Sequence, residues 1–137
     1  MKKIFTLIAI TCLVFCAATS QTAGNGSVEA IDSYKDIDTE VIKIEDTYGA
    51  YHPKAKTVTI ELEHTPLTGE VRLYYTCMAS SFDQGEAMNT AIAVYEDFAL
   101  KNKYKHYSYA GKDKTSYKKD DRGVRMATYV SHVIFKY

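Results

Sequence analysis

The sequence contains no tryptophan, two prolines and three cysteines in 137 residues. Two of the cysteines, Cys12 and Cys16, fall in an apolar N-terminal segment that we expect to be removed, so Cys77 is the only cysteine of the remaining chain. A lone cysteine cannot form an internal disulfide, and the fold must therefore be stabilised by packing. The sequence also lacks a Gly-rich phosphate loop and a Gly-x-Ser-x-Gly nucleophile motif, which argues against the enzyme classes that depend on them.

Long apolar runs are also scarce, and the one that exists is at the N-terminus. Residues 4–18 are uncharged and follow Lys2 and Lys3. This run is shorter than the roughly 18–20 residues that a membrane-spanning helix needs. Small residues follow at Ala18 and Ser20, so the pattern is typical of a cleavable secretory signal. We expect cleavage after Ser20 and export to the periplasm or the extracellular space.

A second processing route remains open. Cys16 follows Leu13-Val14-Phe15, which partly matches a bacterial lipoprotein signal, although Phe15 stands where a small residue is expected. In that case Cys16 would carry a lipid anchor. Residues 21–36 are rich in Gly, Ser, Asn and Ala and predict a flexible lead-in. Residues 37–137 are long enough for one domain.

The patterning of this domain predicts an α+β fold. Strands are expected at residues 40–44, at 56–64, where apolar and polar residues alternate, and at 70–79. Two further strands are expected at residues 104–110 and 124–137, separated by a charged loop over 111–123. The economical packing of this β-β-β-α-β-β order is an antiparallel sheet of about five strands with one helix on a face.

The helix is expected after the third strand. Ser81 and Gln84 have the spacing of a capping box, and Asp83 and Glu86 suit the positive end of the helix dipole. A stripe at helical spacing should pack on the sheet, and its members are Met88, Ala91, Ile92, Tyr95, Phe98 and Ala99.

Residues that could carry chemistry do not form a specific motif. Cys77 could act with a histidine, but it alternates with Val71, Leu73 and Tyr75, which is typical of a buried strand face. The histidines His52, His64, His106 and His132 show no zinc-ligand spacing. We expect no cofactor and no metal. The alternative hypothesis is an envelope enzyme, or an inhibitor of an enzyme, whose site the sequence does not identify.

The charge is unevenly distributed although its sum is zero. Residues 21–97 carry fourteen acidic and five basic side chains, whereas residues 98–137 carry three acidic and ten basic ones. Such asymmetry concerns partners and surfaces and does not determine the fold.

The basic region near the C-terminus is interleaved with tyrosines. Aromatic faces with neighbouring cations can stack on rings and neutralise anions. We therefore predict a non-enzymatic binding domain that uses a basic, Tyr/Lys-rich hairpin, with an acidic protein or an anionic envelope polymer as partner and nucleic acid disfavoured by export. The alternative is a solvated edge whose lysines prevent strand-to-strand aggregation. The candidate binding residues are Tyr107, Tyr109, Lys112, Lys114, Tyr117, Lys118, Lys119, Arg122 and Arg125.

Overall fold

The computed structural model describes residues 37–137. The predicted signal segment 1–20, the alternative lipid attachment at Cys16 and the lead-in 21–36 lie outside the described residues. They stay predictions.

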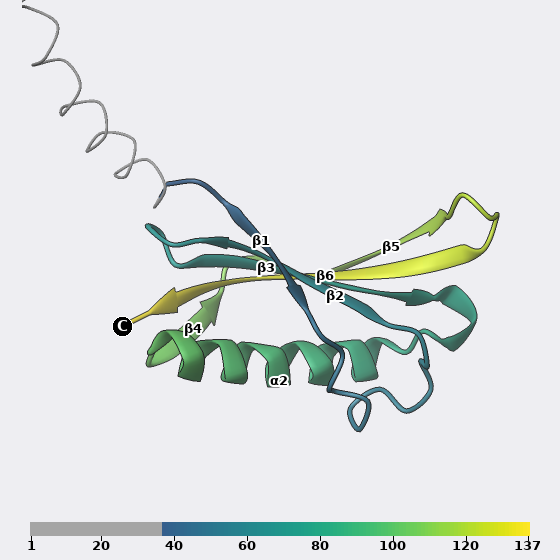
Figure 1. The fold of residues 1–137 in the computed structure, drawn as a ribbon, viewed down its shortest axis with the longest axis horizontal. Coiled ribbons are helices and arrows are strands. Elements are labelled where there is room, and N and C mark those ends of the chain that lie inside the picture. The colour runs from purple at the N-terminus through teal and green to yellow at the C-terminus, as the bar shows by residue number, and fades with distance from the viewer. Residues whose placement is uncertain (1–36) are drawn as a thin grey trace, which may run out of the picture. The chain divides into compact units, whose positions relative to one another are not determined.

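The described residues form one antiparallel sheet with a single α-helix packed on one face, which confirms the predicted fold class (Figure 1). The elements in chain order are β1 (Glu40–Ile44), β2 (Thr59–Thr65), β3 (Glu70–Met78), a short 3-10 turn η1 (Ala79–Ser81), α2 (Gln84–Asn102), β4 (His106–Tyr109), β5 (Lys114–Lys119) and β6 (Arg125–Lys136). The strands lie side by side in the order β1-β2-β3-β6-β4, and β5 also pairs with β6.

The core lies between the sheet and α2, and alternation in β2 and β3 determines which side chains enter it. Leu62 of β2 lies opposite Leu73 of β3, and both are fully buried. Tyr75 and Cys77 continue the same face of β3 and are buried as well. A strand exposes its side chains alternately on its two faces, so the predicted buried face of β3 is confirmed.

The helix begins later than the predicted capping box implies. The N-terminal cap is Asp83, whose carboxylate accepts hydrogen bonds from the backbone N–H groups of Gly85 and Glu86. The predicted cap Ser81 is wrong because that residue belongs to η1. At the other end Lys103 adopts a left-handed conformation, and its N–H is directed at the last helical carbonyls. No helix among residues 37–137 is long and apolar enough to cross a bilayer.

The buried face of α2 is rotated slightly from the predicted stripe. Tyr95 and Phe98 are buried as expected, together with Val94. Met88, however, is 42% exposed, and Thr90 takes a buried place on the helix instead. The Thr90 hydroxyl donates to the carbonyl of Glu86, so its polar atom is satisfied within the helix.

The strands after the helix correct one prediction. The predicted loop over residues 111–123 is wrong at its centre, because Lys114–Lys119 form β5. β4 and β5 lie one after the other along the same edge of β6: Tyr109 pairs with Val133, and Lys114 pairs with Val130. Residues 110–113 therefore oppose only residues 131–132, which makes a bulge between β4 and β5. Pairing with β6, and not its own apolar pattern, makes β5 a strand.

Candidate functional site

The candidate site of the sequence analysis is the hairpin formed by β5 and β6, which extends past the N-terminal end of α2 (Figure 1). The turn at its tip is built by Asp120, whose carboxylate accepts hydrogen bonds from the backbone N–H groups of Arg122 and Val124. Gly123 has φ of 79°, a left-handed conformation that closes such short hairpin connections. The tip is therefore held by specific contacts and presents its side chains on a defined frame.

Two of the three acidic side chains of this hairpin make contacts within the hairpin itself. Asp113, in the bulge, accepts a hydrogen bond of 2.5 Å from the buried hydroxyl of Tyr129. Burial raises the pKa of Tyr129, and the bond to Asp113 raises it further. Asp120 holds the turn and also pairs with the Arg122 guanidinium at 3.1 Å. Only Asp121 is left without such a contact in the part of the chain that the structure describes.

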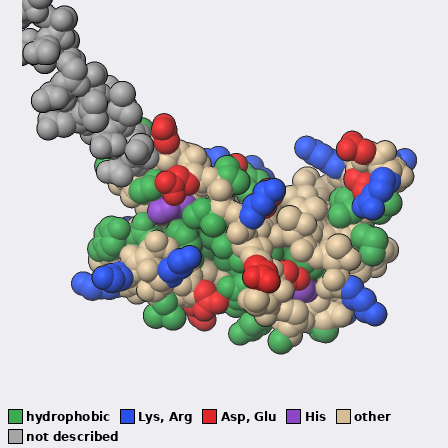
Figure 2. All heavy atoms as spheres, viewed as in Figure 1, with side chains coloured by type: hydrophobic (Ala, Val, Ile, Leu, Met, Phe, Trp, Pro, Cys, Tyr) green, Lys and Arg blue, Asp and Glu red, His purple; other side chains and the backbone are tan. Residues whose placement is uncertain are grey.

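The lysines of the hairpin, by contrast, form no ion pair with any other described residue. Lys112, Lys114, Lys118 and Lys119 are all exposed. Figure 2 shows cationic side chains gathered at the projecting tip, next to a smaller acidic group. The hairpin therefore carries an excess of uncompensated positive charge.

The strand register divides the predicted cations between the two faces of the sheet. Lys114 pairs with Val130 and Lys118 with Met126, so both lysines lie on the face away from α2. Lys119 pairs with Arg125, on the face that carries the helix. The predicted site is therefore a ridge with cations on both sides and not one flat basic surface.

Tyr117 and Arg125 are brought together on the helix face of the hairpin. The Arg125 guanidinium lies 4.9 Å from the centre of the Tyr117 ring, within the range of a cation–π contact. Phe82 packs against the other side of this arrangement, with its ring 6.2 Å from that of Tyr117. Tyr117 remains 50% exposed, so part of its surface is open to a partner.

Tyr107 and Tyr109 lie on the same sheet face as Tyr117 but far from it. The β6 partners of Tyr109 and Tyr107 are six and eight residues away from the partner of Tyr117, which corresponds to about 20 Å and about 27 Å along the strand. Tyr107 packs against Tyr95 at 5.4 Å and against Phe135, so it belongs largely to the core. The structure groups Tyr117 and Arg125 with the lysines, and separates Tyr107 and Tyr109 from them.

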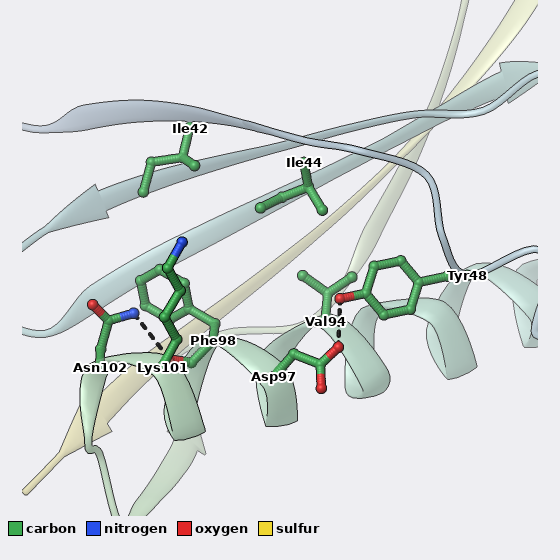
Figure 3. Close-up of a pocket in the computed structure, with 8 residues that line it drawn as sticks. All are labelled: Ile42, Ile44, Tyr48, Val94, Asp97, Phe98, Lys101 and Asn102. Carbon is green, nitrogen blue, oxygen red and sulfur yellow. Dashed lines mark hydrogen bonds between the residues drawn. The ribbon is translucent and has the colours of Figure 1, made fainter.

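A second candidate site, which the sequence analysis did not identify, is a hollow between β1 and the C-terminal half of α2 (Figure 3). Its volume is about 240 Å³, and its lining consists of Ile42, Ile44, Tyr48, Val94, Asp97, Phe98, Lys101 and Asn102. The Tyr48 hydroxyl donates to the Asp97 carboxylate at 2.7 Å. Burial, together with this bond, raises the pKa of Tyr48 to about 12. No local pattern marks this hollow, because its two walls are distant in sequence.

The histidines are held in structural roles where they are buried. The two ring nitrogens of His52 face the carbonyl of Ala55 at 3.0 Å and the carboxylate of Asp46 at 2.9 Å. Burial lowers the pKa of His52, but these two contacts outweigh that effect and raise it overall. His64 contacts the Tyr104 hydroxyl, and burial lowers its pKa. No group of three potential metal ligands occurs among residues 37–137.

Cys77 is free and fully buried in the core, and burial raises the pKa of its thiol. A thiol reacts as the thiolate, so both effects slow its modification. We expect N-ethylmaleimide to label Cys77 at least about a hundredfold more slowly in native protein than in urea, because labelling requires opening of the core. Mass spectrometry of the Cys77 peptide measures this rate separately from other cysteines. Equal rates in the two conditions, or a disulfide-linked dimer, would contradict the expectation.

Comparison of the chain with protein-family models, with curated proteins and with solved structures found no match.

Proposed function

We propose that this protein is a non-enzymatic binding domain that holds anionic polymers of the cell envelope or extracellular space on the β5–β6 hairpin. One observation carries the proposal: the acids Asp113 and Asp120 are tied to groups of the hairpin itself, whereas its four lysines have no anionic partner among the described residues. The proposal includes export, which is supported by the sequence of residues 1–20 alone.

The arrangement of the charges favours a long, flexible anion over a compact one. Lys114 and Lys118 lie on one face of the hairpin, while Lys119 and Arg125 lie on the other. A polymer can contact both faces of a narrow ridge, whereas a small anion would reach one or two cations. Each exposed charge acts over roughly 8–10 Å at physiological salt, so neighbouring cations reinforce each other along the strand.

Tyr117 adds an apolar contact that salt does not screen. Its ring is half exposed and already oriented by Arg125 and Phe82. A ring held in place loses little freedom on binding and can stack on a sugar or another planar group. Binding should therefore weaken as salt rises, but a residual part should persist.

Replacement of Lys114, Lys118 and Lys119 by Ser should weaken retention on immobilised heparin, used as the anionic probe. We expect about tenfold weaker binding, because each exposed charge contributes at most about 1 kcal/mol. Folding should be preserved, since these side chains are exposed and unpaired. The salt concentration needed for elution, together with far-UV circular dichroism, measures the two effects.

The matched control is the replacement of Lys43, Lys56 and Lys105 by Ser, which removes the same charge from exposed positions outside the hairpin. The proposal requires the hairpin variant to elute at clearly lower salt than this control. Equal elution of the two variants would reject the proposal and leave the hairpin lysines with the role of protecting a sheet edge.

A further inference from the structure

The two edges of the sheet differ in how they are protected. On one side, β4 and β5 are interrupted by the bulge at residues 110–113, and this edge carries three exposed lysines in β5 and a fourth, Lys112, in the bulge. Bulges and lysines are two ways in which proteins prevent another strand from pairing with an exposed edge. This edge is therefore closed to strand addition.

The other edge, formed by β1, has no bulge and only one lysine. β1 pairs with β2 through five consecutive residues without a bulge, and contains no proline. Its one lysine, Lys43, lies opposite Glu61 and so faces an acid of its own sheet. No backbone hydrogen bond from another described element reaches the outer side of β1. Val41 is 63% exposed there.

The hollow between β1 and α2 lies beside this open edge (Figure 3). Ile42 and Ile44 form its upper wall, and Val94 and Phe98 of α2 form its floor. About 240 Å³ is less than the roughly 300–1,000 Å³ of ordinary ligand pockets, so the hollow suits one apolar side chain better than a cofactor.

The polar side chains at the rim of the hollow differ in whether they already have a partner within the described residues. Asp97 is engaged by the Tyr48 hydroxyl at 2.7 Å. Lys101 is exposed and forms no ion pair within residues 37–137. Asn102 uses its amide N–H to bond the carbonyl of Phe98. Asp97 keeps its negative charge, but one of its oxygens is held by the Tyr48 hydroxyl. Lys101 is the rim cation that has no ion-pair partner among the described residues, and it is complementary to a carboxylate.

We propose that β1 is a strand-addition site for an extended segment of a partner protein. The segment pairs its backbone with the outer side of β1, directs an apolar side chain into the hollow over Val94 and Phe98, and places an acidic side chain two residues away near Lys101. Residues two apart in a strand share a face, so one strand satisfies both contacts. Backbone hydrogen bonds give affinity in such complexes and the pocket gives specificity. The site is at the sheet edge opposite the hairpin and does not depend on the proposed function.

The test uses a fluorescein-labelled peptide with the sequence acetyl-Thr-Leu-Thr-Glu-Thr-amide and the full chain. We expect saturable binding with a Kd below about 1 mM, measured by fluorescence anisotropy. The same peptide with N-methylated backbone amides keeps its side chains but loses its strand hydrogen-bond donors. Its binding should be at least about tenfold weaker, since several backbone bonds of about 1 kcal/mol are lost.

A pair of variants separates the rim charge from general attraction. Lys101→Gln should weaken binding of the peptide roughly twofold to fivefold, as expected for the loss of one exposed ion pair. A peptide with Gln in place of Glu should bind the Lys101→Gln variant and the parent protein equally well. Lys105→Gln removes another exposed charge, next to β4, and should leave the affinity unchanged. In amide NMR spectra the shifts should centre on residues 40–44.

Three outcomes overturn the proposal: no saturable binding at peptide concentrations up to about 1 mM; equal binding of the N-methylated peptide; or NMR shifts centred on β4 and β5. The last result would place the peptide on the lysines of the opposite edge. Occupation of the β1 edge by another part of the same chain would appear as the first outcome and would likewise reject a partner site.

Discussion

Replacement of Gly69 by Ala is expected to reduce the free energy of unfolding by more than about 3 kcal/mol. Gly69 lies in the turn between β2 and β3 with φ of 67°, where a side chain costs about 1–2 kcal/mol. An added Cβ would also overlap the backbone carbonyl oxygen of Phe135. That segment of β6 cannot move freely, because the N–H of Phe135 donates to the carbonyl of Gly69 at 2.8 Å. Urea unfolding measures the loss.

Gly123→Ala is the matched control for this variant. Gly123 also has a positive φ, of 79°, but nothing lies within 4 Å of the position that its Cβ would take. Its free energy of unfolding should therefore fall only by the cost of the left-handed backbone conformation, about 1–2 kcal/mol. If the two variants were equally stable, close packing of the β2–β3 turn against β6 would not be a major contribution to the fold.

Raising the pH above 10 is expected to unfold the protein in a steep transition. Tyr75, Tyr95 and Tyr129 are almost completely buried, and burial raises the pKa of each above its usual value of 10.0. Above pH 10 the unfolded chain releases these protons while the folded chain retains them, so stability falls as pH rises. Each tyrosine contributes up to about 1.4 kcal/mol per pH unit, and the three together up to about 4 kcal/mol per pH unit.

Tyrosinate absorbance and far-UV circular dichroism, followed through the same titration, measure this effect. Part of the absorbance change should coincide with the loss of secondary structure, because the buried rings ionise only on unfolding. Tyr95→Phe is an informative variant, since the Tyr95 hydroxyl has no hydrogen-bond partner within the described chain. It should leave stability at neutral pH unchanged or higher and reduce the alkaline slope by about a third. Ionisation of all tyrosines before any structural change would contradict the expectation.

Elements whose signal is local could be predicted correctly from the sequence. β2 and β3 alternate strictly, and a period of two leaves one choice of buried face, so Leu73, Tyr75 and Cys77 were assigned to the core correctly. The helix was recognised from its apolar spacing, and burial of Tyr95 and Phe98 followed. Its exact start was not determined, because Ser81 and Asp83 are both good caps and the choice depends on how the chain leaves β3.

Elements that depend on long-range pairing could not be recognised in this way. β5 contains three lysines and no apolar alternation, and it is a strand because the edge of β6 offers hydrogen bonds to it. The candidate basic residues were identified from composition, but composition does not say which face each one occupies. Register places Lys118 and Lys119 on opposite faces and separates Tyr109 from Tyr117.

The positions of the unpaired lysines and of the β1 edge follow from contacts between segments that are distant in sequence. Asp113 and Tyr129 are sixteen residues apart, and their hydrogen bond holds this carboxylate against the buried Tyr129 hydroxyl, a position that composition alone does not reveal. Ile42 and Phe98 are fifty-six residues apart in the sequence, yet they line one hollow. Local sequence determines periodicity, because periodicity depends on neighbouring residues. Contacts between distant segments depend on how the sheet is assembled, which no short stretch of this sequence encodes.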